Sequence, residues 1–234
     1  MPSILHLDAA LVLVNKPAGL LSVPGRGPAG ADCAWARVLP LAGDAQVVHR
    51  LDMATSGLLL FARGAAMQRA LCLAFEARRV DKGYEALVHR GPDEDRGEIA
   101  LPLAADWPRR PRQKVDLAQG KPSLTRWQVL AREGACTRLA LQPVTGRTHQ
   151  LRVHLAAMGW PIVGDALYGD DDGDDDGDDD GDDDGNDDGN DDGNDDGDSA
   201  GADAAPRLML HACALGLAHP LDGRALHWRS PAPF

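Results

Sequence analysis

Short apolar runs alternate with polar, glycine and proline residues along most of this chain, a pattern typical of a strand-rich fold. A polar Asp8-Ala9 pair separates the first two runs and predicts a turn between them. The pattern predicts strands over 4–7, 11–15, 58–62, 82–88, 125–130, 137–142, 208–215 and 226–228.

Three segments show helical spacing instead of strand spacing. They cover residues 32–39, 65–78 and 148–158. In the third, the Thr148 hydroxyl can cap a helix that runs to Met158 and stops at Gly159. Leu151, Leu155 and Met158 would form the buried face of this helix.

The length and composition predict one catalytic domain over residues 1–234. The chain has 234 residues and is 44% hydrophobic, which suits an ordinary buried core. No apolar run approaches the roughly 18 residues that a membrane helix needs. The N-terminus lacks the basic and apolar segments of a signal peptide. We therefore expect a cytoplasmic monomer with no membrane partner.

The net charge of -12 hides two parts of opposite sign. Residues 170–203 hold 20 aspartates and no lysine or arginine, so the remaining 16 acidic residues against 24 Lys and Arg leave +8. A basic body suits a polyanion such as RNA. The four-residue Asp-Asp-Asp-Gly and Asn-Asp-Asp-Gly repeats bury too little to offset the entropy of ordering, so residues 170–205 are predicted to be a disordered insertion.

The densest group of candidate reactive side chains is His49-Arg50-Leu51-Asp52 with Thr55-Ser56-Gly57. Apolar runs flank this group, and Ser-Gly is a common turn pair. Reactive groups usually lie on such a connection, held by a rigid scaffold. Composition alone favours a simpler interpretation, a surface turn with an Arg–Asp pair.

A second polar segment, residues 106–115, combines positive charges with an aromatic ring and two prolines and shows neither helical nor strand period. It is either a solvated basic loop or an RNA contact, in which cations bind phosphates and a ring stacks on bases. The candidate contacts are Trp107, Arg109, Arg110 and Lys114. Lys16, at the end of an apolar run, could be structural or could meet a phosphate.

Five motifs in one order resemble the signature of the RluA-type pseudouridine synthases. They are Asn15-Lys16-Pro17, His49-Arg50-Leu51-Asp52, Lys82-Gly83-Tyr84, Gly146-Arg147-Thr148-His149-Gln150-Leu151-Arg152 and Pro161-Ile162-Val163-Gly164-Asp165. Within that family, residues 106–122 look most like the dual-specificity members, which act on a 23S rRNA hairpin loop and on a tRNA anticodon loop. The chain also resembles those members in lacking an S4-type RNA-binding domain.

The resemblance implies an α+β fold, with helices packed on a mixed, mainly antiparallel sheet and a central catalytic cleft. It implies that Asp52 is the catalytic residue, that Tyr84 lies against the target base, and that Arg152 pairs with Asp52. Arg50 would hold the flipped nucleotide or fill its place. Arg147 would face the RNA, and His149 would be either structural or RNA-facing.

The implied reaction breaks the N1–C1′ bond, turns the uracil and rejoins it through C5. No redox change, metal or outside nucleophile is needed, so we expect no cofactor and no metal site. Asp52 could attack C1′ or remove a ribose proton, and both routes stay open. A carboxylate taken out of water tends to be protonated unless a cation pairs with it, which would be the role of Arg152.

Two other classes of function fit parts of the sequence. A non-catalytic RNA-binding module would use the same basic face but would be expected to lack Asp52. A hydrolase with an aspartate nucleophile should show a second acid or base group close to the first, and the Asp52 motif offers none. The four cysteines lie far apart without a Cys-x-x-Cys pair, so we interpret them as reduced and buried.

Overall fold

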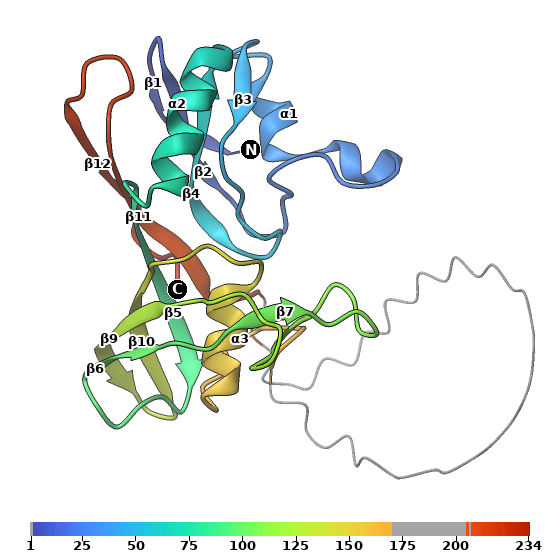
Figure 1. The fold of residues 1–234 in the computed structure, drawn as a ribbon, viewed down its shortest axis with the longest axis vertical. Coiled ribbons are helices and arrows are strands. Elements are labelled where there is room, and N and C mark those ends of the chain that lie inside the picture. The colour runs from blue at the N-terminus through green and yellow to red at the C-terminus, as the bar shows by residue number, and fades with distance from the viewer. Residues whose placement is uncertain (1, 170–204, 206) are drawn as a thin grey trace, which may run out of the picture.

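The computed structural model describes residues 2–169, 205 and 207–234 (Figure 1). The predicted insertion over 170–205 therefore lies outside the described residues, except for Ala205. The helices are α1 (Ala34–Val38), α2 (Gly64–Glu76) and α3 (Gln150–Ala157), with a 3-10 turn at Pro28–Ala31. The strands are β1 (Ser3–Leu7), β2 (Leu11–Lys16), β3 (Ala45–Val47), β4 (Ser56–Arg63), β5 (Asp81–His89), β6 (Arg96–Ile99), β7 (Leu103–Ala105), β8 (Gln113–Val115), β9 (Thr125–Glu133), β10 (Cys136–Pro143), β11 (Leu210–Ala218) and β12 (Ala225–Arg229).

One long sheet runs through the described part of the chain in the order β1-β2-β4-β11-β5-β10-β9-β6, with β3 beside β4 and β12 beside β11. The pairings are antiparallel except for β4 with β11, which is parallel. This sheet joins an N-terminal half and a C-terminal half through β11 and β5 (Figure 1). The eight strands that the apolar pattern predicts are all present. The four short strands β3, β6, β7 and β8 are additions.

Side chains that alternate along β2 divide the core between the two faces of the sheet. Val12 and Val14 pack with α1 on one face, whereas Leu11 and Leu13 pack with Leu71 of α2 on the other. The third helix, α3, packs its own apolar side chains on the C-terminal half of the sheet. Tyr84 of β5 touches both the α1 cluster and the α3 cluster. The helices α1 and α3 therefore lie on the same face as Tyr84, and α2 lies on the opposite face.

The predicted turn at Ser56-Gly57 is wrong, because these residues begin β4. There they pair in parallel with His211 and Ala212 of β11. Gly57 has a φ of 115°, and a Cβ atom there would lie 2.4 Å from the Ala212 carbonyl oxygen. The glycine is thus required by the close approach of β11, and not by a turn.

The third predicted helix starts one residue later than its sequence suggests. Its N-cap is His149, in the left-handed conformation with φ 52°, so the predicted Thr148 cap is wrong. Leu155 is buried as predicted, but Met158 is 42% exposed, because the helix ends at Ala157 before that side chain can turn inward. Gly159 follows with φ 76°.

The cysteine interpretation is confirmed in part. All four cysteines are free, and Cys33 is buried, but Cys72, Cys136 and Cys213 are only half-buried. No helix of the described residues combines the length and apolar character needed to cross a membrane.

Candidate active site

The loop that carries Asp52 connects β3 to β4, and its backbone is held from both sides. Ser22 Oγ accepts a hydrogen bond from Leu51 N at 3.0 Å and donates one to Leu51 O at 2.6 Å. On the other side, Met53 O accepts from Gly19 N at 2.9 Å and from Lys16 Nζ at 2.9 Å. The residue between these anchors therefore has a fixed backbone, while its side chain is 29% exposed.

Lys16 is fully buried beneath this loop. Its ammonium group donates to the carbonyl oxygens of Pro17, Leu20 and Met53 at 3.0, 2.7 and 2.9 Å. Burial lowers the pKa of Lys16 to about 8, although the negative charge of Asp52 acts in the opposite direction. Because all three of its protons are used by carbonyls, Lys16 is structural and is not a phosphate ligand.

The side chains of Arg152, from α3, and of His149, the N-cap of that helix, face the Asp52 carboxylate. Arg152 Nη1 lies 3.7 Å from Oδ2, and His149 Nε2 lies 4.0 Å from Oδ1. The main partner of Arg152 is Asp165, which it binds through Nε at 2.8 Å and Nη2 at 2.6 Å. Arg152 is 5% exposed and Asp165 is fully buried, so the pair presents one free edge of the guanidinium to Asp52.

His149 is fixed by Tyr168, whose Oη lies 2.8 Å from its Nδ1. The same Oη accepts a hydrogen bond of 2.7 Å from the backbone N–H of Gln113. Burial has the largest effect and lowers the pKa of His149. The negative charge of Asp52 raises this pKa and the positive charge of Arg152 lowers it, each by less than burial does. A residue other than glycine with φ 52° is uncommon and costs on the order of 1 kcal/mol, which the surrounding contacts must offset.

Tyr84 completes the group from β5. Burial raises the pKa of its hydroxyl, and the nearby negative charge of Asp52 raises it further, so the phenol is neutral. His49, three residues before Asp52, faces the other way. It accepts from Leu60 N at 3.0 Å and stacks on Phe75, and burial lowers its pKa to about 3. The structure thus brings Asp52, Tyr84, Arg152 and His149 together and leaves His49 in the core.

Known proteins resemble this chain along nearly its whole length. A family model described as RNA pseudouridylate synthase matches residues 10–157. The dual-specificity RNA pseudouridine synthase RluA of Vibrio cholerae is 42% identical over 225 residues, which are 96% of this chain and 79% of that protein. The protein of the same name from Escherichia coli K12 is 39% identical over 232 residues, which are 99% of this chain and 93% of that protein.

The chain belongs to the RNA pseudouridylate synthase family. The solved structure of human RNA pseudouridylate synthase domain containing 1 agrees, with a TM-score of 0.74, 28% identity and coverage of 100% of this chain and 84% of that one. The resemblance in the sequence is therefore confirmed, together with the α+β fold and the mixed, mainly antiparallel sheet. The non-catalytic RNA-binding module and the hydrolase are set aside in favour of an RNA pseudouridine synthase.

The other predicted contacts of this synthase lie outside the Asp52 group. Arg50 is exposed on the same loop. Arg147 is exposed before α3, and its guanidinium donates to Pro122 O at 3.3 and 3.4 Å. The remaining four belong to the β7–β8 hairpin, where Trp107 is 67% exposed and Arg110 lies 3.7 Å from its ring centroid. Arg109 bonds to Asp106, and Lys114 is exposed.

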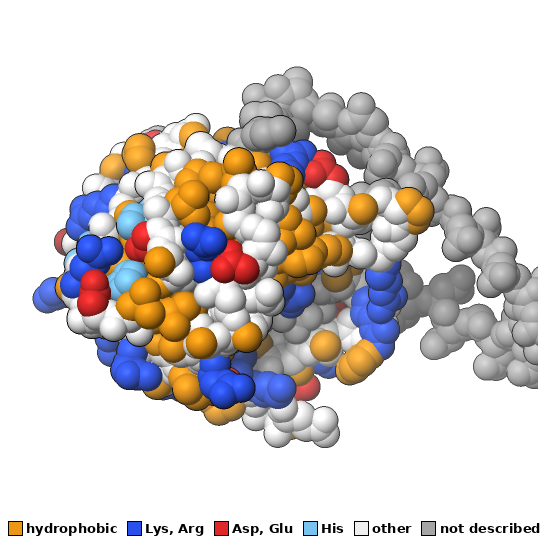
Figure 2. All heavy atoms as spheres, turned by 90° about the horizontal axis from the view of Figure 1, so that it is seen from above, with side chains coloured by type: hydrophobic (Ala, Val, Ile, Leu, Met, Phe, Trp, Pro, Cys, Tyr) orange, Lys and Arg blue, Asp and Glu red, His pale blue; other side chains and the backbone are white. Residues whose placement is uncertain are grey.

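The interpretation of residues 106–115 as an irregular loop is partly wrong, because residues 113–115 form β8 and pair with β7. A three-residue strand is too short to show a period of its own. The exposed tip, residues 106–112, carries the basic side chains, and we call this segment the basic hairpin. Lys and Arg side chains are also spread around the rim of the face seen in Figure 2, with acidic side chains beside several of them.

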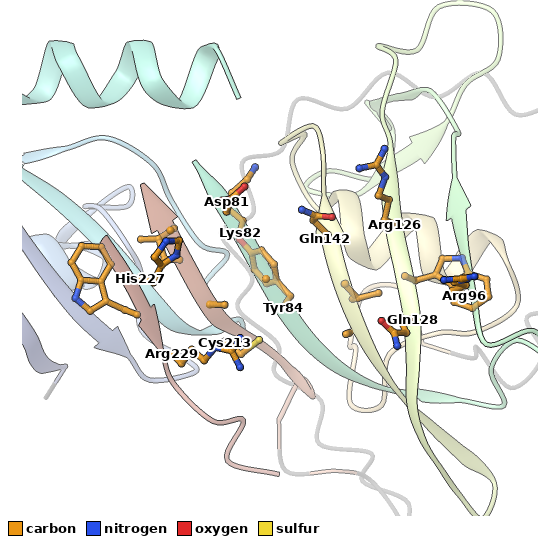
Figure 3. A pocket seen from close by; sticks show the side chains of 18 of the residues that line it. Asp81, Lys82, Tyr84, Arg96, Arg126, Gln128, Gln142, Cys213, His227 and Arg229 are labelled. Atoms are coloured by element: carbon orange, nitrogen blue, oxygen red, sulfur yellow. The ribbon is translucent and has the colours of Figure 1, made fainter. Parts of the chain in front are cut away.

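A hollow of about 660 Å³ lies on the sheet surface formed by β5, β6 and β9–β12 (Figure 3). Its labelled lining includes Arg126, Gln128, Cys213 and His227 (Figure 3). Of the predicted site residues, Tyr84 alone lines it. The hollow is therefore not the Asp52 site.

Sequence reasoning missed two residues of this site. Asp165 belongs to one of the five motifs, but the sequence does not indicate that it binds Arg152. The two side chains meet only because residues 161–168 pack beside α3. Tyr168 has an even weaker signal, a tyrosine before Gly169 at the start of the acidic repeats. Within the described residues, no group of three His, Cys, Asp or Glu side chains is arranged to hold a metal ion.

Proposed function

We propose that Asp52 performs the isomerisation of uridine to pseudouridine in RNA. The observation that carries the proposal is the position of its carboxylate on a loop whose backbone is fixed. The carboxylate lies 3.7 Å from the buried edge of Arg152 and near enough to Tyr84 for its charge to raise the pKa of that phenol. A carboxylate that attacks or deprotonates ribose must be held at a defined distance, and a rigid support provides this.

The proposed roles follow from the surroundings of each side chain. Asp52 attacks C1′ or removes a ribose proton while the N1–C1′ bond breaks. Arg152 stabilises the carboxylate by charge, and its own charge is balanced by Asp165. Tyr84 offers a half-buried ring against which the released uracil can turn before C5 bonds to C1′. This bond displaces the Asp52 carboxylate from C1′ or, in the second route, Asp52 returns the proton to ribose. C5 then loses its proton, and N1 gains one. No step in this sequence uses a metal or a cofactor.

The uridine must leave its stack to reach Asp52, which favours loop nucleotides over paired ones. Arg50, exposed two residues before Asp52, is placed to occupy the space that the flipped base vacates. The basic hairpin would bind the RNA by stacking on Trp107 and by phosphate contacts of Arg109 and Arg110. Lys114 in β8 and Arg147 would add contacts, and His149, whose side chain is 11% exposed, would meet the RNA only at the edge of the Asp52 site. Each exposed cation is available for such contacts.

Because the bacterial relatives are named dual-specificity enzymes, we propose two substrates, a 23S rRNA hairpin loop and a tRNA anticodon loop. The test is incubation of the purified protein with both stem-loops as transcripts and mapping of pseudouridine by carbodiimide labelling and mass spectrometry. One loop uridine should convert in each RNA with wild-type protein and none with Asp52→Asn. Asp95→Asn, with its exposed carboxylate, is the matched control.

Wild-type protein that converts neither stem-loop, but forms pseudouridine in total RNA from a strain lacking the enzyme, would overturn the choice of substrates and leave the proposed activity standing. We also propose that residues 1–234 act as a single catalytic domain and as a cytoplasmic monomer. Light scattering of the RNA-free protein, limited proteolysis and cell fractionation test these points.

A further inference from the structure

The contacts around His149 determine which of its ring nitrogens carries the proton. The backbone N–H of Gln113 can only donate, so Tyr168 Oη must accept from it at 2.7 Å. The single proton of the Tyr168 hydroxyl then points elsewhere, and His149 Nδ1 lies 2.8 Å away. Among the hydrogen bonds of the described residues, Nδ1 is the one acceptor within reach of this proton, which points to a neutral imidazole with its own proton on Nε2.

The Nε2 atom is the one that faces Asp52. Its distance to Asp52 Oδ1 is 4.0 Å, while Oδ2 of the same carboxylate faces Arg152 Nη1 at 3.7 Å. Each carboxylate oxygen therefore has one donor group opposite it. In the other tautomer, the lone pair of Nε2 would face the lone pairs of Oδ1, and attraction would become repulsion.

We propose that Tyr168 is a positioning residue that holds His149 in the Nε2–H tautomer, so that the histidine orients the Asp52 carboxylate for attack on ribose. The inference rests on the proposed role of Asp52. The Gln113 N–H belongs to β8, the strand that follows the basic hairpin, so the hairpin takes part in fixing the tautomer.

The surroundings of His149 support a neutral ring. The charged groups that face it are Asp52 from the loop, Arg152 from α3 and Asp165, and the remaining titratable neighbour is Tyr168. Burial lowers the pKa of His149, and the like charge of Arg152 lowers it further against the two carboxylates. If both ring nitrogens of His149 carried protons, Nδ1 would donate to Tyr168 Oη. That oxygen would then have to accept hydrogen bonds from both Nδ1 and the Gln113 N–H.

The first test reads the tautomer directly and does not depend on activity. Nitrogen NMR of protein labelled at histidine distinguishes a protonated Nε2 from a protonated Nδ1. Wild-type His149 should show the Nε2–H form alone, and Tyr168→Phe should show a mixture of the two tautomers. A wild-type His149 protonated on Nδ1 would overturn the proposal.

The second test is a double-mutant cycle on the single-turnover rate at saturating enzyme. Tyr168→Phe should slow the rate about tenfold, the effect of losing one oriented donor, with an unchanged Kd for RNA. His149→Gln places a donor near Nε2 that has no tautomer, so it should retain most of the rate. Adding Tyr168→Phe to His149→Gln should then change the rate by less than about twofold.

The cycle separates positioning from packing. If Tyr168 only supports the fold, its substitution should slow the His149→Gln enzyme as much as the wild type, and this result would overturn the proposal. His227→Gln, on the exposed face of β12, is the matched control and should leave the rate unchanged. If wild-type protein makes no pseudouridine, the proposed function fails, whereas the NMR experiment still decides the tautomer.

Discussion

The Asp52 loop and the basic hairpin are both exposed connections between strands, but they are built in opposite ways. The loop is anchored by the buried Lys16 ammonium and Ser22 hydroxyl and by the Gly19 amide, which together bind the backbone on both sides of Asp52. In the hairpin tip, the Trp107 ring is 67% exposed and is covered by Arg110 instead of by the core. The side chain of Arg109 is 71% exposed.

This difference teaches how the two tasks of an RNA-modifying enzyme can be divided. A reacting carboxylate must keep its distance to ribose, so it lies on backbone that cannot shift. Cations and rings that bind RNA need only reach phosphates and bases, and exposed side chains suffice. Substitutions that loosen the loop should therefore reduce the chemical rate, whereas substitutions in the hairpin should reduce affinity.

Apart from Asp52 itself, the largest effect is expected at the buried Arg152–Asp165 pair. Asp165→Asn keeps an oxygen that can accept from the backbone amides of Leu167 and Tyr168, but it removes the charge that balances Arg152. We expect a loss of about 3 kcal/mol in the free energy of unfolding and a single-turnover rate reduced on the order of 100-fold, as Arg152 turns toward Asp52. Urea denaturation measures the loss in the free energy of unfolding, and single-turnover assays measure the loss in rate.

The control for this prediction is the corresponding pair in the hairpin. Asp106→Asn removes the charge opposite Arg109, whose side chain is mostly in solvent, so stability should change by less than about 1 kcal/mol. Equal losses for the two variants would mean that the hairpin is anchored as firmly as the loop.

Lys16 provides a pH-dependent test of the anchored loop. Its folded pKa of about 8 lies below its ordinary value of 10.5, so the unfolded chain binds this proton more tightly and stability rises with pH between those values. Lys16→Met lacks this rise and leaves three carbonyls without a donor, which should cost about 2 kcal/mol at pH 7. The difference between wild type and variant should then widen by up to about 3 kcal/mol by pH 10.5.

Denaturation curves from pH 7 to pH 10 provide this comparison. Lys114→Met, in β8 next to the basic hairpin, should give the same stability as wild type at each pH, because Lys114 is exposed. A constant difference between wild type and Lys16→Met across the range would show that the pKa of Lys16 is not lowered and that its ammonium is solvated.

Smaller effects are expected in the hairpin, and they should appear in affinity alone. Trp107→Ala and Arg110→Ala should each weaken RNA binding by about tenfold without changing the single-turnover rate at saturating enzyme. Only Arg110→Ala should also make the salt dependence shallower, by about one unit of log-log slope, because it removes a phosphate contact. Binding titrations over a salt series distinguish a stacking loss from a charge loss.

The sequence predicted the long strands and the helices because their apolar residues follow a period that burial imposes. It located Asp52, Tyr84, Arg152 and His149 by motif, and the fold brings these four together. The three-residue strands had no period to detect. The turn at Ser56-Gly57 was wrong because the demand on Gly57 comes from Ala212, which is distant in sequence.

The pairing of Arg152 shows the same limit more sharply. The sequence predicted Asp52 as its partner, yet its two short hydrogen bonds go to Asp165, and Asp52 faces the remaining edge. Charge and spacing indicate that a buried arginine needs a carboxylate, but only the packing of residues 161–168 beside α3 determines which one. The Tyr168 contact with Gln113 depends on the same packing, and so no local pattern could predict it.

The division between an anchored catalytic loop and an exposed binding hairpin is tested most directly by one measurement on Asp52→Asn. Its single-turnover rate is determined at enzyme concentrations that saturate the anticodon stem-loop, with Kd measured in parallel. The account predicts a Kd within about twofold of wild type and no detectable pseudouridine, a loss of at least about 1,000-fold in rate. Product formed by bound Asp52→Asn at a rate within about tenfold of wild type would contradict the assignment of the reacting carboxylate.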